Sequence, residues 1–197
     1  MNKQIEDIKE IRKMMEKSSK FTSINGLSLI IAGVFATIGG WYAKSLLNNQ
    51  YESTDLILSL FITALVILVL AVGVISFFAW RKAKKNNQSL LNSVTRRAAY
   101  NLLVPLVVGG LFSLLLLLRG DMALVASSTL IFYGLSLVNA SKYTFSDIHI
   151  LGICEVIIGL LAAVFLYNGI LFWILGFGVC HIVFGTIMYI KYDLKKK

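Results

Sequence analysis

The chain has 197 residues, of which 57% are hydrophobic and only 15% are charged. Soluble domains usually contain about a quarter charged residues, so this composition argues against a water-soluble fold. The formal net charge is +9, but the bases stand at the ends of apolar stretches, where they signal membrane topology. We therefore expect no nucleic-acid partner.

The first twenty residues are mostly polar and predict a short amphipathic helix. Its apolar side chains recur at helical spacing and share about half of the helical wheel. They are Ile5, Ile8, Ile11, Met14 and Met15. Two interpretations of residues 1–20 are open. The segment either lies on the cytoplasmic headgroups as an interfacial helix, or docks a partner protein or a second copy of the chain.

Six apolar stretches follow, each long enough to cross about 30 Å of hydrocarbon as a helix. They cover residues 21–43, 56–80, 98–118, 122–140, 148–167 and 169–190. The connections at residues 119–121 and around Asn168 are very short, so the helices that they join form tight antiparallel hairpins. The sequence therefore predicts an all-α, polytopic membrane protein of six transmembrane helices, followed by a basic tail at residues 191–197.

The Lys and Arg residues are divided unequally between the loops. Seventeen of the 19 fall on the side that holds both chain ends, whereas Lys44 and Arg119 fall on the other side. Because short cytoplasmic loops are enriched in bases, we expect a multi-pass protein of the cell membrane with cytoplasmic N- and C-termini. The same bases would attract anionic lipid headgroups of the bilayer.

Two polar residues stand out in the last two predicted spans. Glu155 is the one carboxylate inside a span, where an acidic residue costs about 2.5–3.5 kcal/mol unless a neighbour offsets it. It precedes Asn168 by 13 residues, and His181 follows Asn168 by 13. An antiparallel hairpin that turns at Asn168 therefore places Glu155 and His181 at one depth, which predicts their contact. Their chain neighbours Cys154 and Cys180 belong to the same candidate site.

Three interpretations of this candidate site are open. The first is a structural hydrogen bond between helices, worth about 0.6–2 kcal/mol. The second is a protonatable site in a transporter or sensor, since intramembrane carboxylates mark proton and ion paths. The third is a metal site with Glu, His and Cys ligands, but no familiar spacing supports it, so we expect neither a metal nor a cofactor. Water access to Glu155 would favour transport, and a dry, close-packed hairpin would favour the structural bond.

The fourth predicted span carries a polar stripe. Thr129, Tyr133, Ser136 and Asn139 follow one another at spacings of four, three and three residues, so they share one helix face. Such a face usually packs against another helix. A water-lined or substrate-lined path is the alternative.

Glycines recur in the first, fifth and sixth predicted spans. Gly26 with Gly33, and Gly152 with Gly159, are each seven residues apart. The sixth span contains Gly169, Gly176, Gly178 and Gly185. In membrane helices such small residues indicate places where two backbones approach closely.

No catalytic motif accompanies these features. The sequence contains no nucleophile elbow, zinc-protease motif, phosphate-binding loop or dinucleotide fingerprint, so we expect no enzyme activity and no catalytic residues. The favoured interpretation is a membrane protein that works by association, anchoring or sensing, with a protein partner or a second copy at its cytoplasmic face. The alternative is a small proton-coupled transporter or channel that uses Glu155.

Overall fold

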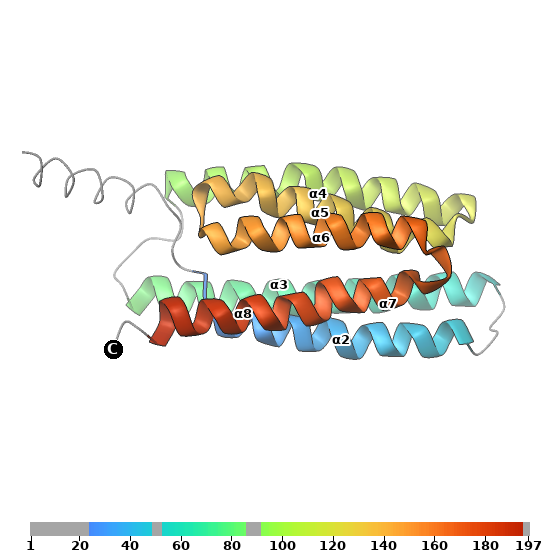
Figure 1. The fold of residues 1–197 in the computed structure, drawn as a ribbon, viewed down its shortest axis with the longest axis horizontal. Coiled ribbons are helices and arrows are strands. Elements are labelled where there is room, and N and C mark those ends of the chain that lie inside the picture. The colour runs from blue at the N-terminus through green and yellow to red at the C-terminus, as the bar shows by residue number, and fades with distance from the viewer. Residues whose placement is uncertain (1–23, 49–52, 86–91, 195–197) are drawn as a thin grey trace, which may run out of the picture.

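The computed structural model describes residues 24–48, 53–85 and 92–194, and these residues form helices joined by short turns, with no strand among them (Figure 1). The predicted amphipathic helix at residues 1–20 lies outside the described residues, as does the end of the basic tail. Six of the described helices are long and apolar enough to cross a membrane. The predicted all-α polytopic fold is therefore confirmed.

The helices differ somewhat from the predicted spans in their bounds. They are α2 (Gly26–Asn48), α3 (Ser53–Lys85), α4 (Ser93–Arg119), α5 (Met122–Ala140) and α6 (Ser146–Val164), with the short helix η1 (Ser141–Tyr143) between α5 and α6. The last span, Leu166–Asp193, consists of η2 (Leu166–Asn168), α7 (Gly169–Trp173), η3 (Ile174–Cys180), α8 (His181–Met188) and η4 (Tyr189–Asp193).

The first described helix, α2, begins at Gly26 rather than at the predicted residue 21, directly after Asn25. The Asn25 side-chain oxygen accepts a hydrogen bond from the Leu27 N–H at 2.8 Å, and its carbonyl accepts one from the Ser28 hydroxyl at 2.6 Å. Such an arrangement satisfies donors at a helix start. The helix α3, in contrast, continues past the predicted end at residue 80 to Lys85, because long basic side chains suit a helix end beyond the hydrocarbon.

The helices are arranged in two layers. Figure 1 shows α4, α5 and α6 in one layer, with α2, α3 and the last span in the other. Contacts between neighbours run in the order α3, α2, last span, α6, α5, α4, with α5 also touching α7. The helices α3 and α4 therefore end the series, and each packs mainly on one neighbour. Their remaining apolar surface is exposed, as lipid-facing helices require.

Close backbone contacts between glycines hold two of these helix pairs together. A methyl group on Gly134 of α5 would lie 2.6 Å from the Gly152 carbonyl oxygen of α6, and one on Gly152 would lie 2.8 Å from the Gly134 carbonyl. A methyl group on Gly33 of α2 would likewise lie 2.8 Å from the carbonyl of Gly178. The predicted close approach is confirmed at these positions, whereas Gly169 makes only ordinary contacts with its neighbours, the nearest at 3.4 Å.

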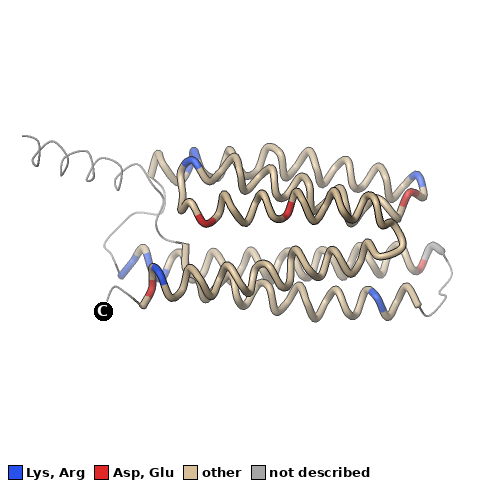
Figure 2. The backbone as a smooth tube through the Cα atoms, in the orientation of Figure 1, with Lys and Arg blue, Asp and Glu red and all other residues tan. Residues whose placement is uncertain are grey.

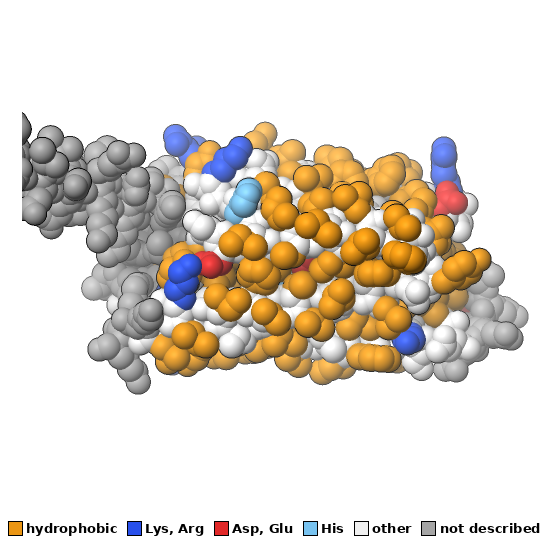
Figure 3. Space-filling view, in the orientation of Figure 1, with side chains coloured by type: hydrophobic (Ala, Val, Ile, Leu, Met, Phe, Trp, Pro, Cys, Tyr) orange, Lys and Arg blue, Asp and Glu red, His pale blue; other side chains and the backbone are white. Residues whose placement is uncertain are grey.

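The bundle has one strongly basic end. Figure 2 shows most Lys and Arg residues where α4 and α6 begin and where α3 and the last span end. The described bases at this end, called the basic end below, are Arg81, Lys82, Lys84, Lys85, Arg96, Arg97, Lys142 and Lys191. Lys44 and Arg119 lie at the opposite, far end. Between the two ends, hydrophobic side chains cover the face seen in Figure 3.

Candidate functional site

Three polar side chains from three helices meet inside the bundle. Glu155 of α6 is fully buried, and His181, the first residue of α8, is 4% exposed. The His181 Nδ1 atom lies 3.4 Å from Glu155 Oε1, so the predicted contact of these two residues is present. The third member is Tyr133 of α5, whose hydroxyl lies 2.8 Å from His181 Nε2. We refer to Tyr133, Glu155 and His181 as the intramembrane cluster.

The histidine of this cluster has a hydrogen-bond partner at each ring nitrogen. Its Nδ1 lies 3.1 Å from the Gly176 carbonyl oxygen, and because a carbonyl only accepts, Nδ1 carries the proton and donates it. In the neutral ring, Nε2 then accepts from the Tyr133 hydroxyl. Glu155 lies within ion-pair distance of Nδ1, but neither of its carboxyl oxygens has a hydrogen-bond partner among the described residues.

The carboxyl group of Glu155 fits against a widened turn of the last span. The segment η3 is a π-helix of seven residues, a rare conformation that often occurs at functional sites. A methyl group placed on Gly176 of this segment would overlap Glu155 Oε2. Glycine at this position therefore makes room for the carboxyl group. The backbone carbonyl of Gly176 is also the acceptor for the His181 Nδ1–H.

The two cysteines of the candidate site are free thiols. Cys154 and Cys180 are both partly buried, and Cys180 packs against the apolar core residues Leu130, Leu151 and their neighbours. No group of three or more His, Cys, Asp or Glu side chains that could hold a metal ion occurs within residues 24–48, 53–85 and 92–194. The metal interpretation therefore gains no support from this geometry.

The polar stripe of the fourth predicted span contacts helices on two sides. Tyr133 faces the last span through His181, while the Asn139 side chain donates to the Asn101 carbonyl of α4 at 3.4 Å. Ser136 is fully buried, and its hydroxyl donates to the Phe132 carbonyl of its own helix. The Thr129 hydroxyl likewise donates to the Ala126 carbonyl, and its side chain lines a cavity. The stripe thus contacts neighbouring helices through Tyr133 and Asn139 and a cavity through Thr129.

The link between Tyr133 and the Glu155–His181 pair was missed in the sequence, although a signal for it exists. Tyr133 precedes Thr144 by 11 residues, and Glu155 follows Thr144 by 11. Thr144 lies in the connection between α5 and α6. The same comparison of depths that paired Glu155 with His181 therefore also places Tyr133 level with them.

Ion pairs at the basic end join the first and last helices. The carboxylate of Asp193 accepts from the Gly26 N–H at 2.8 Å and from the Lys82 ammonium at 2.7 Å. Lys82 also donates to the Ile24 carbonyl at 2.7 Å. Asp193 thus connects the start of α2, the end of α3 and the end of the last span, in a position where a negative charge also favours a helix N-terminus.

A second ion pair joins the last span to α6. The carboxylate of Asp147, in the first turn of α6, accepts from the Lys191 ammonium at 3.1 Å and from the Tyr192 hydroxyl at 2.6 Å. The ring of Tyr192 stacks on Phe145, with 4.1 Å between the ring centroids. Asp147 and Asp193, the two described acidic residues at the basic end, therefore both form ion pairs with lysines of the bundle.

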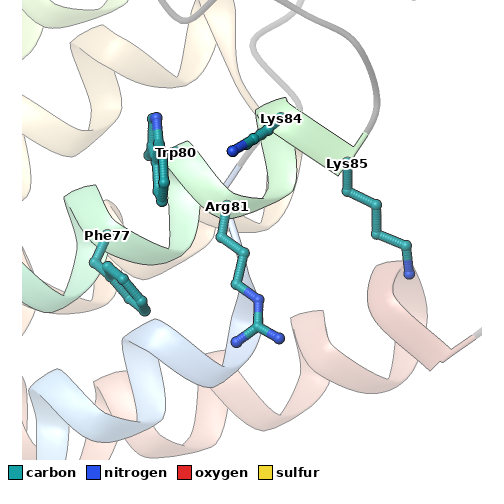
Figure 4. A pocket seen from close by; sticks show the side chains of 5 residues that line it. All are labelled: Phe77, Trp80, Arg81, Lys84 and Lys85. Atoms are coloured by element: carbon teal, nitrogen blue, oxygen red, sulfur yellow. The ribbon is translucent and has the colours of Figure 1, made fainter.

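Several bases at this end have no acidic partner within the described part of the chain. They are Arg81, Lys84 and Lys85 of α3 and Arg96 and Arg97 of α4, and all five are exposed. The three bases of α3, together with Phe77 and Trp80, line a shallow hollow of about 520 Å³ (Figure 4). The Lys84 ammonium lies 5.3 Å from the centre of the Trp80 ring, a cation–π contact.

The fold and these sites define an integral, multi-pass helical membrane protein. Comparisons with known proteins found no matching family model, no matching curated protein and no matching solved structure.

Proposed function

We propose that this chain is a non-enzymatic membrane protein that works by association, with the helix bundle as its anchor and the basic end as a surface that recruits an acidic partner protein. The observation that supports it is the imbalance of charge at the basic end. Asp147 and Asp193 are held by ion pairs inside the bundle, whereas the exposed bases of α3 and α4 have no acidic partner among the described residues.

The position of these bases also supports a docking role. The ion pairs of Asp193 and Asp147 fix the ends of α2, α3, α6 and the last span relative to one another, so the surface is presented on a rigid support. Phe77 and Trp80 are half exposed beside the bases of α3 and offer an apolar contact. Since bases favour the cytoplasmic side, we further propose that the basic end faces the cytoplasm, where anionic lipid contributes about 1 kcal/mol per base near the surface.

Co-purification in mild detergent tests this proposal. The native chain is expected to retain a partner that high salt releases, and the triple variant Arg81→Gln, Lys84→Gln, Lys85→Gln is expected to lose it. The matched control is Lys44→Gln with Arg119→Gln, which removes bases only from the far end and should retain the partner. A native chain that purifies alone, or with anionic phospholipid as the sole salt-sensitive partner, would contradict recruitment of a protein.

Proton-coupled transport is the second candidate, and it is favoured by the buried carboxyl of Glu155, which has no hydrogen bond among the described residues. A buried polar group without a hydrogen bond is costly, and this one lies against a π-helix, a conformation that often occurs at functional sites. The burial of the cluster speaks against it, because Glu155 and His181 line neither the hollow of α3 nor the larger cavity near the far end. Uptake driven by a pH gradient in liposomes would support transport only if Glu155→Gln abolished it.

A further inference from the structure

A second cavity lies between the helices in the half of the bundle near the far end. Its volume is about 540 Å³, within the range of about 300–1,000 Å³ that is usual for small-molecule sites. Residues of α2, α3, α4, α5 and the start of the last span line it. We refer to it as the lateral cavity, because the two helices at the ends of the series, α3 and α4, form two of its walls.

The lateral cavity is continuous with the lipid-facing surface. Phe61 and Leu65 of α3 and Leu114 of α4 line it, and the same side chains are 47%, 48% and 38% exposed. The helix α3 packs on α2, whereas α4 packs on α5. The cavity therefore lies between α3 and α4, which pack on different partners. An apolar molecule can therefore enter sideways from the hydrocarbon without crossing a polar layer.

The lining selects an apolar occupant. None of the described residues that line the cavity is charged. Its Thr63 and Thr129 hydroxyls donate to carbonyls of their own helices, and the Ser113 hydroxyl lies 2.7 Å from that of Ser128. The hydrogens of these hydroxyls are thus already engaged within the bundle, so the lining offers few polar contacts to an occupant. Small residues in the walls, including Gly110 and Ala126, leave this space open.

We propose that the lateral cavity binds an acyl chain of a bilayer phospholipid. The occupant has to be apolar, elongated and present in the hydrocarbon beside α3 and α4, and acyl chains of the surrounding lipid meet all three conditions. Filling the cavity restores the dispersion contacts that an empty apolar space lacks. The acyl chain then packs between the two layers and supports α3 and α4 on the side where neither has a neighbouring helix.

Trp173 provides a reporter inside this site. Its side chain lines the cavity and is partly buried, while Trp41 and Trp80, the other two tryptophans, are exposed. The variant Trp41→Phe, Trp80→Phe leaves Trp173 as the single tryptophan. In vesicles of phosphatidylcholine with acyl chains brominated near their middle, we expect strong quenching of its fluorescence, because bromine quenches only at contact distance.

Two glycine substitutions separate binding in the cavity from general contact with lipid. A methyl group added at Gly110 or at Gly73 meets no atom within 4 Å, so both positions have open space where a larger side chain begins. Gly110 lines the cavity, whereas Gly73 of α3 does not. The quenching ratio is the Trp173 fluorescence in unbrominated vesicles divided by that in brominated vesicles. In the single-tryptophan background, Gly110→Leu is expected to lower this ratio towards unity, and Gly73→Leu is expected to leave it unchanged.

The same measurement can overturn the proposal. Equal quenching in the parent, Gly110→Leu and Gly73→Leu would show that lipid reaches Trp173 by another route. Absence of quenching in the parent would exclude an acyl chain, and a dimer under the same conditions would assign the space to a second copy. Should Gly110→Leu unfold in detergent, Ala126→Leu fills the cavity from α5 and is judged by the same criterion.

Discussion

At the scale of single residues, the intramembrane cluster divides its hydrogen bonds unequally. His181 is satisfied at both ring nitrogens by Gly176 and Tyr133, while the carboxyl of Glu155 depends on its 3.4 Å approach to Nδ1. Either a neutral pair or an ion pair can occupy this geometry. In both, removal of His181 leaves the Glu155 carboxyl as a lone polar group among apolar side chains, and such a group is costly. His181, in contrast, keeps its contacts with Gly176 and Tyr133 when Glu155 is replaced.

A double-mutant cycle measures the link between Glu155 and His181. We expect Glu155→Gln and His181→Phe to be coupled by about 0.6–1.7 kcal/mol in the free energy of unfolding, the range found for polar contacts between membrane helices. Chemical unfolding in detergent micelles of the two single variants and the double variant gives this coupling. The control pairs Glu155→Gln with Tyr42→Phe, an exposed tyrosine at the far end, and should give no coupling. A zero result for Glu155 with His181 would make their approach energetically irrelevant.

The sequence predicts some contacts of the intramembrane cluster and not others, because residue spacing determines only depth. Depth across a tight turn depends only on residue count, so the pairing of Glu155 with His181 was predictable. The partner of Nδ1 was not, because the Gly176 carbonyl lies within the π-helix η3, whose register is set by packing of Glu155 and neighbouring helices. A lone carboxyl in a span therefore indicates that partners exist without identifying all of them.

At the scale of helices, the reciprocal contact of Gly134 and Gly152 sets the distance between α5 and α6. We predict that Gly152→Ala lowers the free energy of unfolding by about 1–3 kcal/mol, as expected when an added methyl group overpacks a core. The methyl would lie 2.8 Å from the Gly134 carbonyl and 2.9 Å from the Val138 N–H nitrogen, which are backbone atoms that cannot move aside singly.

The matched control is Gly73→Ala in α3, where an added methyl group has no neighbour within 4 Å. Alanine there should be neutral or slightly stabilising, since it has the higher helix propensity by about 1 kcal/mol. Both variants are compared by thermal unfolding in the same detergent. Equal stability of the two would mean that α5 and α6 separate without cost, contrary to the close packing described above.

The ends of helices were less predictable than their existence. Hydropathy marks the part of a helix that lies in hydrocarbon, but a backbone stays helical until a cap or a turn ends it. The helix α2 therefore starts after Asn25 and continues through Lys44 to Asn48. The last span similarly continues to Asp193, three residues beyond its predicted end, because Asp193 and Tyr192 make the contacts that fix it.

At the scale of the whole molecule, eight of the ten described bases lie at the basic end. If this end faces the cytoplasm, a reporter enzyme that is active only outside the cytoplasm should be silent when it is fused to the C-terminus. The same reporter inserted in the connection after Gly120, at the far end, should be active. Activity of the C-terminal fusion would reverse the proposed orientation while leaving the fold unchanged.

Neighbours that are consecutive in the chain could be predicted, but distant ones could not. Short connections force α4 beside α5 and α5 beside α6. The contact of α2 with the last span depends instead on the fit of Gly33 to Gly178 and of Gly26 to Gly185. The glycines indicate that these helix faces pack closely, but an apolar sequence does not determine which two glycine-containing faces contact each other.

The central position of the last span has a consequence for biosynthesis. Helices enter the membrane in the order of synthesis, so α6 brings Glu155 into the bilayer before the ribosome has made His181. The N–H of Gly26 at the start of α2 similarly lacks its acceptor until Asp193, at the end of the last span, has been made. A nascent protein thus keeps the Glu155 carboxyl group without His181, and the start of α2 without Asp193, until the last span has been synthesised.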